Sequence, residues 1–246
     1  MNLNFSAQEI RPNVYHFSFD NQYYLTSSMM RVQEYYESPF KGIRGEFFKT
    51  EQYMDVYANN KNDSEFSYFT DWSGFNIPGN VILDFYERFK YDLLLKERTL
   101  FDLILLFRHE EKIFKNKNQF YVIATFKGKE EMSAIRHELS HAYWYLHKKL
   151  YADASRELLK DKKSIEPKAL YTIKKSLLDM GYCEEVLEDE AQAYLCSSTR
   201  SFITQRLGAP EKAKISIGFK KLFDSFDSVQ VSKLSKNAPK YAEQKT

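Results

Sequence analysis

Short apolar stretches rich in aromatic and β-branched residues predict two strands in the first half of the chain. One is "NVYHFSFD" at residues 13–20, and the other is "QFYVIATFK" at residues 119–127, each bounded by polar residues. Between them, "TSSMMRVQEYYES" at 26–38 has a helical pattern that the following proline ends, and residues 81–111 are helical in pattern again. The first half is therefore predicted to mix strands and helices.

Residues 59–80 lack such a pattern and are predicted to form a loop. The stretch is polar and ends with two glycines and a proline in close succession. Its aromatic residues Phe69, Trp72 and Phe75 indicate that the loop is ordered and packs on the body of the protein. A role in lining a cleft is the alternative interpretation.

The second half of the chain is predicted to be almost entirely helical. Helical patterns follow one another there with short polar breaks: "ADASRELLK", "PKALYTIKKSLLDM", "EVLEDEAQAYLCSSTRSFITQRL" and "EKAKISIGFKKLFDSF". We therefore predict an α+β fold in one domain, 1–234. It consists of a small mixed N-terminal lobe with a short sheet (1–130), a central helix (131–150) and a helical lobe (151–234), and a polar tail (235–246) follows it.

Composition and charge exclude several classes of protein. Of the 246 residues, 43% are apolar and 16% are aromatic, which is typical of a globular chain. A net charge of +2 is too small to indicate a nucleic-acid partner. The longest apolar runs are too short to span a bilayer, and no signal peptide is visible, so we expect a cytoplasmic protein or one exported without a cleavable signal. Cys183 and Cys196 predict buried thiols rather than a disulfide.

The segment "RHELSHAYWYLH" at 136–147 contains candidate metal ligands and a candidate general base. His137 and His141 are four residues apart, so a helix places both imidazoles on one face, within reach of a single ion. Catalytic zinc takes three protein ligands of this kind and leaves one position open for water. Glu138 follows the first histidine, where its carboxylate can act as general base toward a zinc-activated water. The opposite face of this helix is apolar: Ile135, Leu139, Ala142, Tyr143 and Leu146.

The third ligand has two candidates in different parts of the chain. His147 is ten residues after His137, as in the metzincin pattern HExxHxxGxxH, but Trp144 occupies the position of the glycine that turns the chain. With no helix breaker, the helix is expected to continue through Leu150, and His147 then points roughly 100° away from the other two histidines. The alternative ligand is a glutamate of "VLEDEAQAYL" at 186–195.

Two glutamates of that later helix can be distinguished by their position. Glu190 lies roughly 45° from the centre of the apolar face, whereas Glu188 lies roughly 115° away, near the polar side. A carboxylate that faces a core needs a partner or a metal. We therefore predict Glu190 as the third ligand, with Glu188 as the alternative, and we expect Glu188 and Asp189 to be ordinary solvated charges.

Together the two segments resemble the gluzincins, the thermolysin-like class of zinc metallopeptidases, with HExxH on one helix and a glutamate ligand on a later one. "HELSH" matches fully, whereas "DEAQAY" matches Asn-Glu-x-x-(Ser/Ala)-(Asp/Glu) in part, with Asp189 at the asparagine position. Tyr194 replaces the acidic residue that would orient the first histidine, so a partner for His137 stays unassigned. The gap between His141 and Glu190 is closer to that of the lethal-factor-like members. The resemblance covers residues 132–195.

The resemblance implies a zincin-like fold, one zinc ion per chain on His137, His141 and Glu190, and a peptide or protein substrate. Tyr182 is the first candidate for the donor that stabilises the oxyanion, and Tyr194 is the second. The strand at 120–126 is expected to be the sheet edge that holds an extended peptide. Two alternatives are a non-catalytic zinc-binding interaction protein with a vestigial site and a hydrolase of non-peptide amides.

Overall fold

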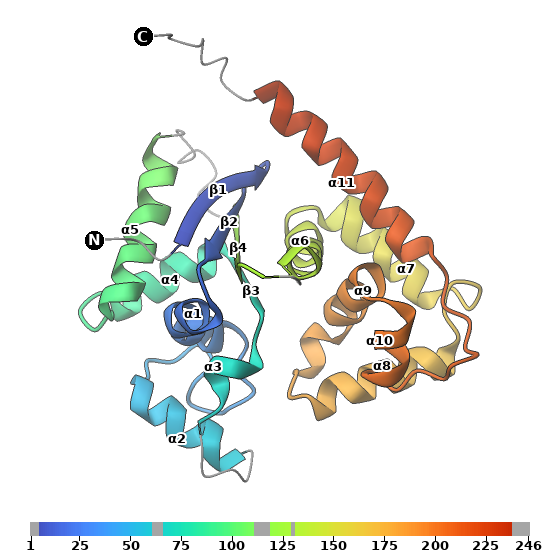
Figure 1. The fold of residues 1–246 in the computed structure, drawn as a ribbon, viewed down its shortest axis with the longest axis horizontal. Helices are drawn as coiled ribbons and strands as arrows, with labels where there is room; N and C mark the ends of the chain where they lie inside the picture. Colours follow the sequence, from blue (N-terminus) through green and yellow to red (C-terminus); the bar gives the residue numbers. More distant parts are fainter. Residues whose placement is uncertain (1–4, 61–65, 111–118, 129–130, 238–246) are drawn as a thin grey trace.

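A four-stranded sheet forms the centre of the computed structural model, which describes residues 5–60, 66–110, 119–128 and 131–237. The strands are β1 (Phe5–Arg11), β2 (Val14–Phe19), β3 (Gly74–Pro78) and β4 (Tyr121–Phe126). Their order is β1-β2-β4-β3, with β2 and β4 parallel and the two outer pairs antiparallel (Figure 1). The predicted strands at 13–20 and 119–127 are confirmed, and the fold is α+β with mostly helical content.

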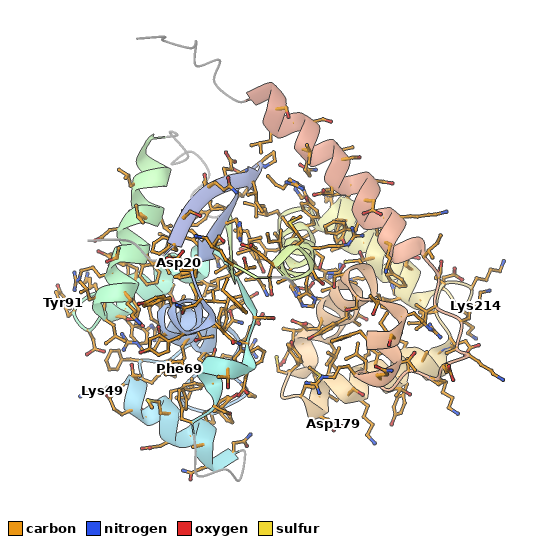
Figure 2. All side chains as sticks on the ribbon, viewed as in Figure 1. Asp20, Lys49, Phe69, Tyr91, Asp179 and Lys214 are labelled. Atoms are coloured by element: carbon orange, nitrogen blue, oxygen red, sulfur yellow. The ribbon has the colours of Figure 1, made fainter. Side chains whose placement is uncertain are left out.

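The sheet separates two hydrophobic cores because neighbouring side chains of a strand point to opposite faces. Val122 and Ala124 of β4 belong to one core, whereas Tyr121 and Ile123 belong to the other. Figure 2 shows side chains filling the space on both sides of the sheet. Each face is thus covered by helices, which explains why β4 is buried along almost its whole length.

The helices of the N-terminal half lie on one side of the sheet, where α1 and α4 make the main contacts with the strands. They are α1 (Gln22–Glu37), α2 (Thr50–Asn60), α3 (Tyr68–Asp71), α4 (Gly79–Phe89) and α5 (Leu95–Glu110). The side chain of Asn21 caps the start of α1, where its oxygen accepts a hydrogen bond from the backbone of Tyr24. The helix predicted before Pro39 is therefore confirmed, and the helical pattern over 81–111 corresponds to two helices, α4 and α5.

The prediction of a loop over 59–80 is wrong for much of that stretch, because α3 and β3 lie within it. Both elements are short, and the apolar–polar alternation of β3 extends over only three residues, 75–77, between a glycine and a proline. A run of that length does not identify a strand from the sequence. Phe75 is fully buried, while Phe69 and Trp72 pack against the same core, as predicted.

The second half is helical around one central helix. Its elements are α6 (Glu131–Leu146), the π-helix η2 (Lys148–Ala152), α7 (Asp153–Lys160), α8 (Pro167–Asp179), the 3₁₀-helix η3 (Glu184–Val186), α9 (Leu187–Ser197), α10 (Arg200–Gln205) and α11 (Gly218–Asn237). Helix α6 lies between the sheet and α9 (Figure 1). Among the described residues, no helix is long and apolar enough to cross a bilayer.

Three predicted helix boundaries in this half are wrong. Helix α6 ends at Leu146 rather than at Leu150, because His147 leaves the helical conformation (φ −125°, ψ 50°) before η2 begins. The helical pattern from 211 begins only at Gly218 in the structure. Helix α11 runs to Asn237, into the predicted polar tail, whose remainder, 238–246, lies outside the described residues.

The N-terminal end of α6 is fixed to the sheet by polar contacts. Ser18 of β2 donates a hydrogen bond to Glu131, the first residue of α6, at 2.5 Å. His16 of β2 lies 2.8 Å from the hydroxyl of Thr125 on β4, beside the same glutamate. At the other end, Tyr143 of α6 and Arg11 of β1 both donate to Asp227 of α11. The helix that carries the histidines is thus held at both ends.

One buried carboxylate makes the stability of the N-terminal lobe depend on pH. Burial raises the pKa of Glu34 to about 7 from an ordinary 4.5, although Ser38 and two tyrosine hydroxyls partly offset this effect. Because the folded-state pKa is the higher one, the folded protein loses stability as the pH rises from 4.5 to 7 and stays at that lower stability above 7. The loss amounts to roughly 3 kcal/mol at most.

We therefore expect Glu34→Gln to raise the free energy of unfolding at pH 8 by up to about 3 kcal/mol, and to change it far less at pH 5. Urea denaturation at the two pH values measures the difference. Glu51→Gln, at an exposed position of α2, is the matched control and should stay within about 0.5 kcal/mol at both. An equal effect of Glu34→Gln at both pH values would contradict this assignment.

Candidate metal centre

Three side chains from two neighbouring helices converge on one point. His137 and His141 lie one turn apart on α6, and Glu190 lies in the first turn of α9. The Nε2 atoms of the two histidines are 3.3 Å apart. The carboxylate of Glu190 lies 3.6 Å from Nε2 of His137 and 3.5 Å from Nε2 of His141. One ligand atom from each residue falls within 4.8 Å of the others, so the group has the dimensions of a metal site.

Hydrogen bonds to the outer ring nitrogens orient both imidazoles. Nδ1 of His141 lies 2.9 Å from a carboxylate oxygen of Asp189. Nδ1 of His137 lies 3.3 Å from the hydroxyl of Ser197, and that hydroxyl donates its own proton to the carbonyl of Ala193. Both partners therefore accept a hydrogen bond, which places the proton of each neutral imidazole on Nδ1. Both Nε2 atoms then direct a lone pair at the shared point, as metal ligands do.

Glu190 is a buried carboxylate in an acidic environment. It is 4% exposed, and its Oε2 atom accepts no hydrogen bond from any described residue. Burial opposes its ionisation, but the charge of His141 and the contact with His137 keep the pKa of Glu190 below its usual range. Burial raises the pKa of Glu37, on α1, to about 8, and the charge of Glu190 adds to that shift. This concentration of negative charge favours a bound cation.

The pKa of His141 is affected by the same carboxylates. Burial lowers it, but Asp189 and Glu190 outweigh burial and raise the pKa of His141 well above its usual value. Protons therefore compete with a metal for this imidazole, and a metal that binds must displace them.

Glu138 lies beside the triad and is almost completely buried. Nδ2 of Asn76, on β3, donates a hydrogen bond of 2.9 Å to its Oε2 atom. Gly74, also on β3, lies so close that a Cβ atom there would be 2.4 Å from Oε1. Burial raises the pKa of Glu138, whereas the two histidines and the hydrogen bond from Asn76 act in the opposite direction. A raised carboxyl pKa suits a general base that works near neutral pH.

The three acidic residues at the start of α9 have separate roles. Glu188 is partly exposed and lies near the cationic groups of Arg156 and Lys174, as expected for a surface charge. Glu190 faces the histidines instead. The prediction that Asp189 is an ordinary solvated charge is wrong, because Asp189 contacts His141 in the manner just described. The helical wheel predicts that Glu190 faces inward, as observed, but it does not predict the contact of Asp189 with a residue of another helix.

His147 is not part of the converging group. Its ring packs against Tyr143 and Phe226 on the far side of α6. It also lines a surface pocket of about 550 Å³ together with Gln119, Tyr145 and three residues of η2. The metzincin-like arrangement therefore has no support in the positions of the side chains.

The two tyrosines predicted as oxyanion donors lie next to each other. Their hydroxyl oxygens are 3.2 Å apart. The ring centroid of Tyr194 lies 4.5 Å from that of His137. Burial, with the charge of Glu190, raises the pKa of Tyr182 well above its usual value, and its hydroxyl therefore keeps its proton. One of the two hydroxyls donates to the other, so one O–H of the pair remains free to donate near the triad.

The strand before α6 is not an edge of the sheet, and that prediction is wrong. β4 pairs on both sides, with β2 and with β3, so its backbone groups are already engaged. The outer strand on the side of the triad is β3, which runs antiparallel to β4 and contributes the residues that touch Glu138. This arrangement does not follow from the sequence, because the strand pattern within residues 59–80 is only three residues long.

Comparison of the chain with protein-family models, with curated proteins and with solved structures gives no match in any of the three. The interpretation of the site therefore depends on its own residues and their geometry.

The contact between Asp189 and His141 predicts an effect on metal affinity. Removing the hydrogen-bond partner of a metal-ligating histidine typically weakens binding by about 10- to 100-fold. We expect this loss in Asp189→Ala, measured by competition for zinc with a chromophoric chelator. Glu188→Ala removes a charge from the adjacent position and is the matched control, with affinity close to that of the unchanged protein. Equal losses in the two variants would indicate a general charge effect and refute the specific contact.

Proposed function

We propose that this protein is a zinc-dependent metallopeptidase of the zincin-like, gluzincin-type arrangement. The observation that carries the proposal is the convergence of His137, His141 and Glu190 with Glu138 directly beside them. A site that only binds zinc for structural reasons has no need of a buried carboxylate next to it, whereas a hydrolytic site requires a base there.

The donor set fits zinc. Two neutral imidazoles and one carboxylate are the ligands of the thermolysin-type catalytic zinc site, and they leave a fourth position for water or substrate. The Oε2 atom of Glu190, which accepts no hydrogen bond within the described part of the chain, is an available ligand atom. When bound, a zinc ion supplies Lewis acidity, which polarises the scissile carbonyl and makes water nucleophilic near neutral pH.

The remaining steps belong to side chains of this protein. Glu138 takes a proton from the attacking water and delivers it to the amine that leaves. Its burial keeps bulk water away from this proton transfer. Tyr182 and Tyr194, both protonated, are the candidate donors to the oxyanion that forms on the former carbonyl oxygen. Asp189 and Ser197 keep the two imidazoles in the required tautomers.

Metal content distinguishes the ligands. Elemental analysis of the purified protein should give about one zinc per chain, as expected of a mononuclear site. Glu190→Ala should lose the zinc, because one of only three protein ligands is removed, and His147→Ala should keep it. Loss of zinc in His147→Ala with retention in Glu190→Ala would contradict the proposed ligand set.

The role of Glu138 is tested by measuring peptide cleavage rather than zinc content. Glu138→Gln should retain about one zinc per chain, because Glu138 is not a ligand, and should lose roughly 100- to 10,000-fold in kcat on a library of quenched fluorescent peptides. Unchanged cleavage by the zinc-loaded variant would refute the role of Glu138. Stoichiometric zinc with no cleavage by the unchanged protein would instead favour the non-catalytic zinc-binding alternative.

A further inference from the structure

Glu138 is held by a chain of two hydrogen bonds that begins in the centre of the sheet. The hydroxyl of Tyr121, on β4, donates to Oδ1 of Asn76 at 2.5 Å. Nδ2 of Asn76 then donates to Oε2 of Glu138 at 2.9 Å. All three side chains are buried, and Tyr121 is 1% exposed. The three groups lie on three different elements, β4, β3 and α6, so the contacts are built by the tertiary fold and not by local sequence.

The direction of this chain is fixed by its chemistry. An ionised carboxylate only accepts hydrogen bonds, so the amide of Asn76 must present its nitrogen to Glu138 and its oxygen to Tyr121. The hydroxyl of Tyr121 completes the arrangement, because it is a donor to that oxygen. A flipped amide would place its oxygen against the carboxylate of Glu138 and leave the amide nitrogen facing the tyrosine. The acceptor-only carboxylate therefore selects this orientation of Asn76, and the tyrosine hydroxyl stabilises it by donating to the amide oxygen.

The other carboxylate oxygen is confined by the backbone of the same strand. Oε1 of Glu138 lies where a side chain at position 74 would begin, so only glycine leaves room for it. Strand β3 thus affects both carboxylate oxygens of Glu138. The amide of Asn76 donates to Oε2, and Gly74, which has no side chain, leaves the space that Oε1 occupies. A glutamate on a helix ordinarily has several accessible rotamers, and these contacts restrict it to one.

We propose that Asn76, oriented by Tyr121, is a positioning residue that aims the carboxylate of Glu138 for proton transfer, and that Gly74 provides the space this orientation requires. The catalytic part of this inference rests on the proposed peptidase function. The sequence had placed Asn76 and Gly74 in a loop without a role. A small misplacement of a catalytic group can cost on the order of 100-fold in rate, so a device that fixes the base is expected to matter.

The first test uses the metal-free full-length protein and needs no activity. The side-chain amide signals of Asn76, identified by their absence in Asn76→Ala, are followed by NMR in protein labelled with ¹⁵N. Glu138→Gln replaces a charged acceptor by a neutral one and should shift the hydrogen-bonded Nδ2 proton upfield. Tyr121→Phe should also move these signals. Signals that stay in place in both variants would overturn the proposed contact.

The second test separates positioning from folding through kinetics. Asn76→Asp keeps the size of the side chain but removes the hydrogen-bond donor. Asn76→Ala removes the donor and shortens the side chain. Each variant should lower kcat roughly 10- to 100-fold, with KM within about twofold of the unchanged value and zinc content near one per chain. Tyr121→Phe should give a smaller loss of the same kind. Full kcat in Asn76→Asp, or a change confined to KM, would overturn the positioning role.

Gly74→Ala tests the confinement of the second oxygen. The added methyl group should displace the carboxylate and lower kcat by a similar factor, roughly 10- to 100-fold, without loss of zinc. Gly128→Ala is the matched control, since a Cβ atom there meets only the ring of Phe126 at an ordinary 3.6 Å. Equal kcat in the two variants would contradict the role of Gly74.

The two proposals fail in different ways. If the unchanged protein binds zinc but cleaves nothing, the peptidase function fails, and the NMR experiment still decides whether Asn76 holds Glu138. If the protein is active and the Asn76 variants keep full kcat, the positioning role fails while the function stands.

Discussion

The site depends on a buried negative charge that needs a cation. Glu190 is ionised, nearly inaccessible to solvent, and has one oxygen that accepts no hydrogen bond from the described residues. Two imidazole nitrogens face the same point, and their tautomers are set by acceptors on the outer side of each ring. Lone pairs brought together in this way repel one another unless a positive charge lies between them. A proton on His141 meets that requirement in the absence of metal, and in the proposed function a divalent cation takes its place.

The fold serves this arrangement by holding α6 between two partners of different kinds. On one side α9 supplies Glu190 as well as the groups that orient the histidines, and all of them lie within about three turns of helix. On the other side the sheet supplies the contacts to Glu138, from β3 directly and from β4 through Tyr121. The proposed metal ligands and the proposed base are thus oriented independently, by the helical lobe and by the sheet.

Long elements with a clear period could be predicted from the sequence, and so could the convergence of His137, His141 and Glu190. The spacing of His137 and His141 fixes their common face on any helix, and the apolar face of α9 singles out Glu190 from Glu188. The predictions that are wrong concern features that depend on tertiary contacts. Strand β3 alternates over only three residues between a glycine and a proline, which is too short to identify a strand. The sequence therefore predicts neither the position of Gly74 and Asn76 beside Glu138 nor the second neighbour of β4. The change of backbone conformation at His147 could not be predicted, because no glycine or proline lies near it in the sequence.

The most direct test of this account is X-ray absorption at the zinc edge on the protein as purified, combined with the same measurement on Glu190→Ala. The account predicts one zinc with two imidazole ligands and nearby oxygen ligands, at about 2.0–2.2 Å, and a changed or absent spectrum in the variant. A zinc coordinated by three imidazoles, or a spectrum that Glu190→Ala leaves unchanged, would contradict the claim that His137, His141 and Glu190 form the metal centre.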